Sequence, residues 1–241
     1  MFCLRLATRD IALTASMAAL YVVLSRLPGF PVIGVEGANI GIVSCVVPVF
    51  GFLLGPWLGG STAFFGGVAS RVLFGASLFT WLTLPSMALC AFVTGCLSRQ
   101  KVGSLMGWVV GALVLGGLIF AWYVTWVGRL VWVFALLHWV ALAVVLIFRD
   151  WFAYFIQRGE GAELTVCVAL CGFVATMVAQ MYGTLAFFVA AELGFIGVPL
   201  DVVLFLGIIP VAAVERLIIT AITTVLGMPI LLALRRQFRH S

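Results

Sequence analysis

Charged side chains are scarce in this chain. Of its 241 residues, 9% are Asp, Glu, Lys or Arg and 65% are hydrophobic. A soluble domain carries about 25% charged residues. A chain with so few charges could not cover its surface with polar groups in water. The composition therefore excludes a water-soluble globular domain.

Motifs for catalysis and for nucleotide binding are absent from the sequence. It contains two histidines and neither an H-E-x-x-H nor a G-x-S-x-G pattern. The G-K-[ST] end of a P-loop is absent as well, so the chain cannot hydrolyse ATP by that route. We expect a protein that is not an enzyme and that uses no cofactor or metal. If it moves a solute uphill, the energy comes from an ion gradient or from another subunit.

Long apolar runs, in contrast, recur from end to end. A helix needs roughly 20 residues to cross about 30 Å of hydrocarbon. In lipid the backbone must pair its own polar groups, and these runs are continuous rather than alternating, which favours helices over a barrel. The sequence thus predicts an all-α, polytopic helical protein of the cell membrane. We predict about eight spans, at residues 10–27, 40–54, 56–71, 80–98, 103–128, 130–148, 163–193 and 203–235.

The second and third spans are separated at "LLGPWLGG" (53–60). Gly55 suits the end of a helix and Pro56 suits a helix start. Both spans are short, at about 15 residues each, whereas a helix that crosses the membrane needs about 20 residues. A re-entrant hairpin over 40–71 is therefore the alternative to two separate spans.

Basic residues follow the predicted topology. With the N-terminus inside, nine of the thirteen lie on the inner side: Arg5, Arg9, Arg99, Lys101, Arg149, Arg158, Arg235, Arg236 and Arg239. Cytoplasmic segments are enriched in Lys and Arg, so both termini are expected in the cytoplasm. Because this bias accounts for the net charge of +5, we expect a lipid bilayer around the chain and no nucleic-acid partner.

A few polar residues within or beside the spans are candidates for a site. "PGFPVIGVEGANIGI" (28–42) places Glu36 and Asn39 on the outer side. We expect the last helix to start at Pro210, which puts Glu215 and Arg216 within about 10 Å of its outer end. Ionisable groups at that depth are costly unless they are paired or face a cavity.

Two interpretations of these groups stay open. One is an internal ion pair, Glu215 with Arg71 or Arg216 with Glu36. The other is a solute cavity near the outer leaflet, walled by the last helices and capped by the 28–42 loop. The candidate substrate-binding residues are Glu36, Asn39, Arg71, Gln180, Tyr182, Glu215 and Arg216.

Small residues line one face of the first predicted helix. In "IALTASMAALYVV" they are Ala12, Ala15, Ser16 and Ala19. Small side chains at three- and four-residue spacing let helices approach closely. This face either packs inside the protein or docks on a partner.

Four segments resemble the substrate-binding S-components of energy-coupling factor (ECF) type ABC transporters. They are the alanine-rich "IALTASMAALYVVLSRLPG" (11–29), the loop "FPVIGVEGANIG", the hairpin "PVFGFLLGPWLGGSTAFFGG" (48–67) and "LGIIPVAAVERLIITAITTVLGMPILLALRR" (206–236). The resemblance implies a single membrane domain over 1–241. Its six core helices would lie within 10–98 and 163–235, and 103–148 would be an inserted helical pair.

The resemblance also implies a function. S-components capture vitamins or similar micronutrients on the outer side, under the first loop and against the last helices, which points to the seven candidate residues. The alanine face of the first helix would dock on a membrane scaffold (T) subunit driven by two ABC ATPases. A stand-alone secondary transporter or channel, which would favour symmetric halves with broken helices, is the alternative.

Overall fold

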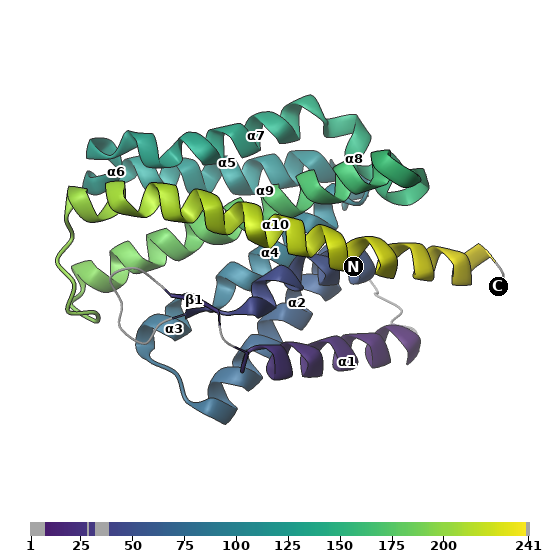
Figure 1. Ribbon diagram of the computed structural model, residues 1–241, viewed down its shortest axis with the longest axis horizontal. Helices are drawn as coiled ribbons and strands as arrows, with labels where there is room; N and C mark the ends of the chain where they lie inside the picture. The colour runs from purple at the N-terminus through teal and green to yellow at the C-terminus, as the bar shows by residue number, and fades with distance from the viewer. Residues whose placement is uncertain (1–7, 28, 32–38, 240–241) are drawn as a thin grey trace.

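The computed structural model describes residues 8–27, 29–31 and 39–239, and most of them are helical (Figure 1). In chain order the helices are α1 (Thr8–Leu24), α2 (Val47–Phe74), α3 (Leu78–Leu82), α4 (Leu84–Leu97), α5 (Gly107–Val124), α6 (Trp126–Leu130), α7 (Leu136–Ile147), α8 (Arg149–Arg158), α9 (Gly161–Glu192) and α10 (Val202–Arg239). Two short 3-10 helices are η1 (Ile42–Cys45) and η2 (Trp132–Ala135). Two antiparallel strand pairs join β1 (Phe30–Pro31) to β2 (Asn39–Ile40) and β3 (Lys101–Val102) to β4 (Leu105–Met106).

Several helices have the length and composition of membrane spans. Among the described residues, five are long and apolar enough: Val47–Phe74, Leu78–Leu97, Gly107–Val124, Gly161–Glu192 and Val202–Ala233. Trp132–Ile147 reaches the length and hydropathy of a membrane span only when it is taken together with α8, and the two helices are bent by 70° relative to each other. α1 is a shorter apolar helix, about 26 Å long at 1.5 Å per residue. The protein is therefore a helical membrane protein, as the composition predicts.

α2 is a hairpin of two helical arms rather than one straight helix. Gly55 adopts φ 78° and ψ −175°, in the left-handed region that favours glycine, and Pro56 follows it. A Cβ placed on Gly59 would lie 2.8 Å from the carbonyl oxygen of Phe50. In a continuous helix these two residues would be about 13 Å apart, so the second arm (56–74) folds back on the first (47–54).

The first arm is shorter than the span expected over 40–54. Together with η1 it extends about 20 Å, less than the roughly 30 Å of hydrocarbon. Residues 30–31 and 39–40, which precede it, form a strand pair, and the flanking residues 29 and 41 are not helical. This geometry favours the hairpin interpretation of 40–71, with the break at Gly55 as predicted.

Glycines bring the α2 hairpin and α4 into backbone contact. A Cβ on Gly51 would lie 2.2 Å from the carbonyl oxygen of Ala91. A Cβ on Gly95 would lie 2.4 Å from the backbone nitrogen of Pro56. Side chains at these positions would force the helices apart, because real Cβ atoms do not approach other atoms so closely.

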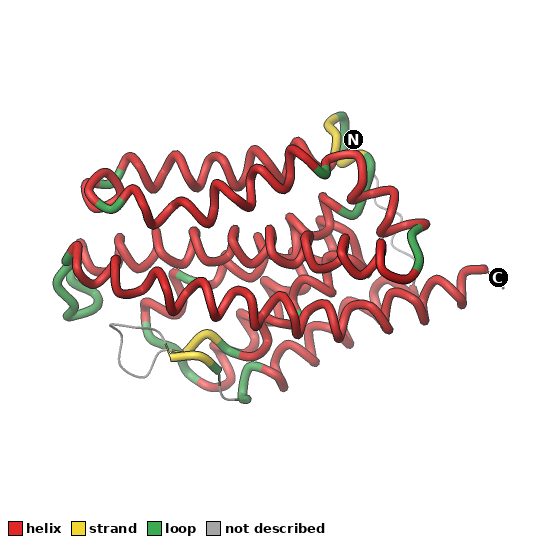
Figure 2. Tube along the Cα trace, turned by 45° about the horizontal axis from the view of Figure 1, so that its top comes forward, coloured by secondary structure: helices red, strands yellow, loops and turns green. Residues whose placement is uncertain are grey.

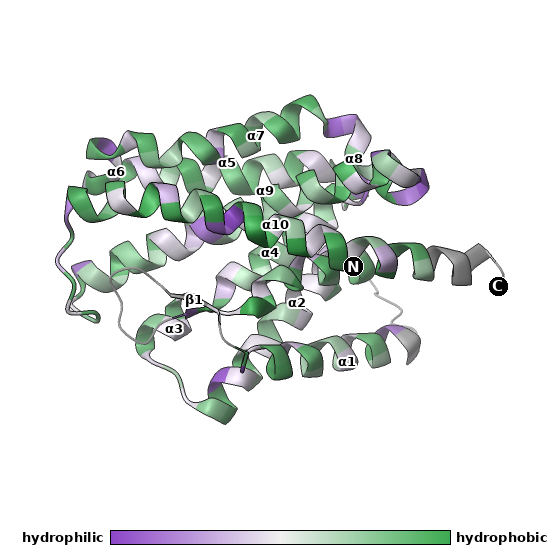
Figure 3. Cartoon of the chain, viewed as in Figure 1, coloured by the Kyte–Doolittle hydropathy of each residue, from purple (hydrophilic) through white to green (hydrophobic). Residues whose placement is uncertain are grey.

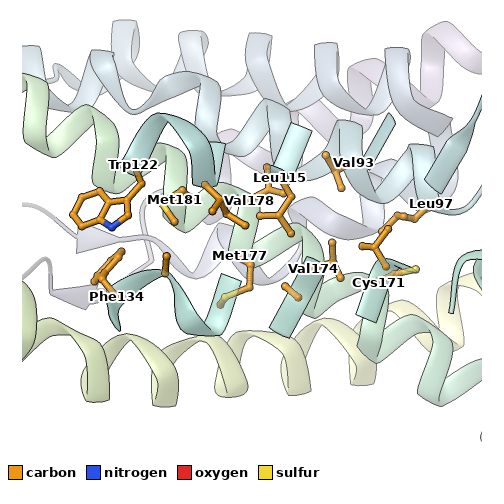
Figure 4. Packing of buried hydrophobic residues seen from close by; sticks show 14 of the residues in the cluster. Val93, Leu97, Leu115, Trp122, Phe134, Cys171, Val174, Met177, Val178 and Met181 are labelled. Atoms are coloured by element: carbon orange, nitrogen blue, oxygen red, sulfur yellow. The ribbon is translucent and has the colours of Figure 1, made fainter. Parts of the chain in front are cut away.

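The segment 103–148 packs onto the remaining helices as part of the same core. α5 and α7 lie side by side along the edge of the molecule farthest from α1 (Figures 1 and 2). Both contact α9, and buried hydrophobic side chains lie between them (Figure 4). Buried members of this core are Val93, Leu97, Leu115, Trp122, Phe134, Cys171, Val174, Met177, Val178 and Met181.

α10 begins eight residues earlier than Pro210, the start that the sequence suggested. It starts at Val202, whose neighbour Val203 donates its backbone N–H to the Asp201 carboxylate at 3.2 Å. Such an N-terminal carboxylate stabilises a helix start, and Pro210 within the helix removes one donor without ending it. Glu215 is thirteen residues from Val202, so it lies about 20 Å along the helix instead of within 10 Å.

The two ends of the molecule differ in which elements they hold. α1 begins, α10 ends and α8 lies at one end, whereas α3, α6 and the connection from α9 to α10 lie at the other (Figure 1). Hydrophilic residues lie at both ends, and a further hydrophilic stretch lies midway along α10 (Figure 3). Residues of that part of α10 line the candidate site.

Candidate functional site

A cavity of about 520 Å³ lies among nine of the described elements. Its walls come from the end of α1, from β2 and η1, from the end of α2, from α3 and the start of α4, from η2, and from one face each of α9 and α10. Small-molecule sites measure about 300–1,000 Å³, so the cavity has the size of a ligand site.

Helical periodicity explains how α9 and α10 present their residues. The cavity-lining positions of α9 are Ala179, Gln180, Gly183, Thr184 and Phe187. Those of α10 include Phe205, Ile208, Ala212, Glu215 and Arg216. Spacings of three and four residues place each set along one helix face.

Glu215 and Arg216 form an ion pair in the cavity wall. Their exposed fractions are 8% and 3%, and Arg216 Nη2 donates to the Glu215 carboxylate. Arg216 Nη1 also donates to the backbone carbonyl of Thr176 on α9, at 3.4 Å. Its Nε is buried without a hydrogen-bond partner among the described residues. The Arg216 Nε–H therefore stays available to donate a hydrogen bond to another group.

Arg71 is held by backbone carbonyls. Its Nε donates to Thr80 at 2.9 Å and its Nη1 donates to Gly67 at 3.0 Å, which ties α2 to α3. The Tyr21 hydroxyl lies beside it, since both groups come within 3.4 Å of the Cβ position of Gly67. Of the two suggested ion pairs, Glu215 with Arg71 does not form, because Glu215 pairs with its sequence neighbour. Arg216 with Glu36 involves a residue outside the described part of the chain.

Two side-chain amides also line the cavity. Gln180 Oε1 is buried and has no hydrogen-bond partner among the described residues. Asn39 lies in β2, opposite Pro31, where the strand pair meets the cavity. The structure thus brings together five of the seven candidate residues: Asn39, Arg71, Gln180, Glu215 and Arg216.

The other two candidates are not part of the described cavity. Glu36 lies outside the described residues. Tyr182 is not among the lining residues, because it follows Gln180 by two positions and so points about 200° away from it around the helix. Two residues so spaced on one helix cannot face the same cavity.

Several lining residues were not anticipated from the sequence. Arg26 lies just after α1, and its guanidinium lies 4.6 Å from the ring centroid of Phe74. Phe134 comes from η2, inside the predicted insertion, and no sequence signal points to it. Gly183 lies in an apolar run, and only its spacing of three residues from Gln180 indicates that it shares the same helix face.

An aromatic cluster forms part of the wall. Phe187 lies edge to face with Phe79 at 6.1 Å and with Phe205 at 6.0 Å between ring centroids. Phe134 contacts Phe205 in the same way at 6.2 Å. These contacts join α3, α9, α10 and η2, and such edge-to-face pairs stabilise a rigid apolar surface.

The small-residue face of α1 is exposed. α1 packs on the second arm of α2 through its opposite side, where Gly66 approaches Tyr21 and the carbonyl oxygen of Ala18. The exposed small residues are Ala12, Ala15, Ser16 and Ala19. Packing against the described part of the chain therefore does not account for them.

Comparison with known proteins adds a distant relative. No family model matches the sequence, and no solved structure matches it at a significant level. The chain is 27% identical over 179 residues to Uncharacterized protein MJ0923 of Methanocaldococcus jannaschii. The match covers 72% of this chain and 54% of that protein, so the chain spans about half the length of the curated relative that it matches.

Proposed function

We propose that this chain is a membrane-embedded solute-binding subunit that captures a small polar molecule in the cavity. The observation that carries the proposal is a cavity of ligand size whose lining residues include polar atoms without a partner. Arg216 Nε and Gln180 Oε1 are buried without hydrogen bonds among the described residues. Leaving a buried polar atom unpaired costs about 1–3 kcal/mol, which a bound solute or water would recover.

The proposed topology has both termini in the cytoplasm. The crossing passages are α1, α3 with α4, α5, η2 with α7, α9 and α10, and the α2 hairpin enters and leaves on the outer side, so it does not change the side of the termini. Support comes from the position of the start of α1 and the end of α10 at the same end of the molecule as α8 (Figure 1). α8 carries Arg149 and Arg158, and cytoplasmic segments are enriched in such residues. The cavity, lined by the ends of α1 and α2, then opens toward the outer side.

The importer that would use this subunit is of the ECF type. The resemblance to S-components supports this, as does the absence of a P-loop from the sequence. In that arrangement the exposed face with Ala12 and Ala15 docks on a scaffold subunit, and two ABC ATPases supply the energy. The solute would be a vitamin-like molecule or another micronutrient.

A pair of glycine substitutions tests the cavity. Gly183 lines it, and a Cβ there would meet no atom within 4 Å, so Gly183→Leu places a side chain in the cavity without a backbone clash. Gly207 on α10 is equally open but does not line the cavity, so Gly207→Leu is the matched control. We expect Gly183→Leu to lower solute affinity at least about tenfold and the control to leave it unchanged.

The measurement is purification from native membranes in mild detergent, followed by mass spectrometry of partners and of small molecules released on denaturation. We expect one scaffold subunit and two ATPases with the wild type and with both variants. A released small molecule should accompany the wild type and Gly207→Leu only. The same molecule on Gly183→Leu would contradict the cavity as the site. Reproducible recovery without ATPases, with uptake that follows a proton or sodium gradient, would replace the importer by a secondary transporter.

A further inference from the structure

The charges around the cavity are unequal. Three guanidinium groups line it, from Arg26, Arg71 and Arg216, against one carboxylate, from Glu215. Three positive charges and one negative charge give a net charge of +2 for the described lining residues. Glu36 is not counted because it lies outside the described residues, and a second carboxylate would still leave one net positive charge.

Internal pairing neutralises only one of the three cations. Glu215 pairs with Arg216, and no described carboxylate lies within ion-pair distance of Arg71 or Arg26. Arg71 is fixed by its two backbone carbonyls, so its guanidinium is preorganised. A cation beside lipid loses solvation, and a bound anion compensates this loss.

The remaining groups limit the body of the ligand. Phe79, Phe187 and Phe205 provide a rigid apolar wall. Gln180 Oε1 can accept a hydrogen bond and Arg216 Nε can donate one, both without competition from described residues. A ligand that satisfies all of these groups has an acidic group, a flat apolar body and a small polar substituent.

We infer that the cavity selects a small organic anion, with its carboxylate or phosphate held by Arg71 and Arg26 and its apolar body against the phenylalanines. The Glu215–Arg216 pair and Gln180 bind the polar substituents. The inference rests on the proposed solute-binding function and specifies the charge of the solute, which that function leaves open.

Three probes of the same shape and different charge test this selectivity. They are 3-phenylpropionate, 3-phenylpropanamide and 3-phenylpropylamine, titrated calorimetrically into the protein in phosphatidylcholine nanodiscs. We expect the carboxylate to bind at least about tenfold more tightly than the amide, and the amine to bind most weakly. Equal binding of all three, or tightest binding of the amine, would overturn anion selectivity and leave solute binding intact. No heat with any probe at roughly millimolar concentration would also count against an anion site of this form.

Arginine substitutions assign the effect to the cavity. Arg26→Gln removes an exposed guanidinium with no side-chain hydrogen bond among the described residues, so folding is preserved. Arg129→Gln removes an exposed guanidinium from α6, outside the cavity, and is the control. We expect Arg26→Gln to weaken the carboxylate about three- to tenfold and the amide not at all, with Arg71→Gln weakening the carboxylate further. Equal losses in Arg26→Gln and Arg129→Gln would overturn the assignment.

A lipid headgroup is the other source of an anion. The titration is therefore repeated in nanodiscs that contain phosphatidylglycerol. Unchanged carboxylate binding supports a soluble ligand. Its loss would assign the arginines to a lipid phosphate and overturn the proposal. The purification of partner ATPases is independent of every one of these outcomes, so failure here and failure of the importer proposal are distinguishable.

Discussion

The two faces of α9 meet different surroundings. One face carries Val174, Met177, Val178 and Met181, which are buried in the core that α9 forms with α4, α5 and α7 (Figure 4). A second face carries Gln180, Gly183, Thr184 and Phe187 and lines the cavity. Both sets follow the same helical spacing, and at 100° per residue their centres lie about 120° apart around the helix.

The two faces of α9 therefore have different roles: one stabilises the fold, and the other is available to bind a solute. On the closed face every side chain is apolar and touches others, so removing atoms costs stability. On the cavity face, polar atoms such as Gln180 Oε1 and the nearby Arg216 Nε have no partner among the described residues. The polar groups of this face contribute little to folding and keep hydrogen-bonding capacity for another molecule. Three substitutions test this separation.

The largest effect is expected on the closed side. Trp122 is fully buried, with ring centroids 4.9 Å from Phe134 and 5.4 Å from Phe205. Trp122→Ala leaves a large void and should cost about 3–4 kcal/mol of unfolding free energy. The measurement is the thermal unfolding midpoint in one detergent. Trp132→Ala, at a side chain that is 56% exposed, is the control, and equal midpoints for the two variants would contradict a rigid closed side.

A smaller loss is expected from breaking the ion pair on the cavity side. Glu215→Ala leaves Arg216 unpaired and should lower the free energy of unfolding by about 3 kcal/mol. This is the lower end of the range for a buried ion pair, because this pair faces a cavity. Glu215→Gln keeps a hydrogen-bond acceptor and should lose less. The double variant Glu215→Leu with Arg216→Met should recover most of the stability while abolishing solute binding. Retained binding in the double variant would show that the pair is structural only.

The smallest effect on stability is expected at the strand pair. A Cβ on Gly29 would lie 2.1 Å from the carbonyl oxygen of Ile40, whereas a Cβ on Gly41 meets its nearest atom at 3.4 Å. Gly29→Ala should therefore displace β1 from β2 and cost about 1–2 kcal/mol, and Gly41→Ala should cost almost nothing. Both glycines line the cavity, so calorimetric titration of each variant with the solute measures whether displacing the strand pair weakens binding. Equal affinities in the two variants would show that the strand pair does not contribute to the binding site.

The helical class and the break in α2 could be predicted from the sequence for local reasons. Continuous apolar runs favour helices in lipid, and Gly55 followed by Pro56 favours the end of one helix and the start of another. The start of α10 could not be predicted in this way. Pro210 suggested a boundary, but the Asp201 cap and the packing of Phe205 against Trp122 sustain helix before it.

The site was predictable only as far as helical spacing and charge allowed. Arg71, Gln180 and Glu215 are polar groups in apolar runs, which is a strong signal. Phe134 is one aromatic residue among many, and only the packing of 103–148 against α9 brings it to the cavity. The partner of Glu215 was also unpredictable, because neighbouring helical residues point about 100° apart unless both side chains bend toward one cavity.

The depth of the Glu215–Arg216 pair has an electrical consequence. The pair lies near the middle of Val202–Ala233, the apolar part of α10. Moving one elementary charge across a membrane potential of 100 mV is worth about 2.3 kcal/mol. The pair is neutral as a unit, and the proposed anion is held by Arg71 and Arg26 at the ends of α2 and α1, so its charge crosses only a small share of that potential on binding. Binding from outside would therefore depend weakly on the membrane potential, and most of the electrical work of moving the anion inward would fall in the transfer step that follows.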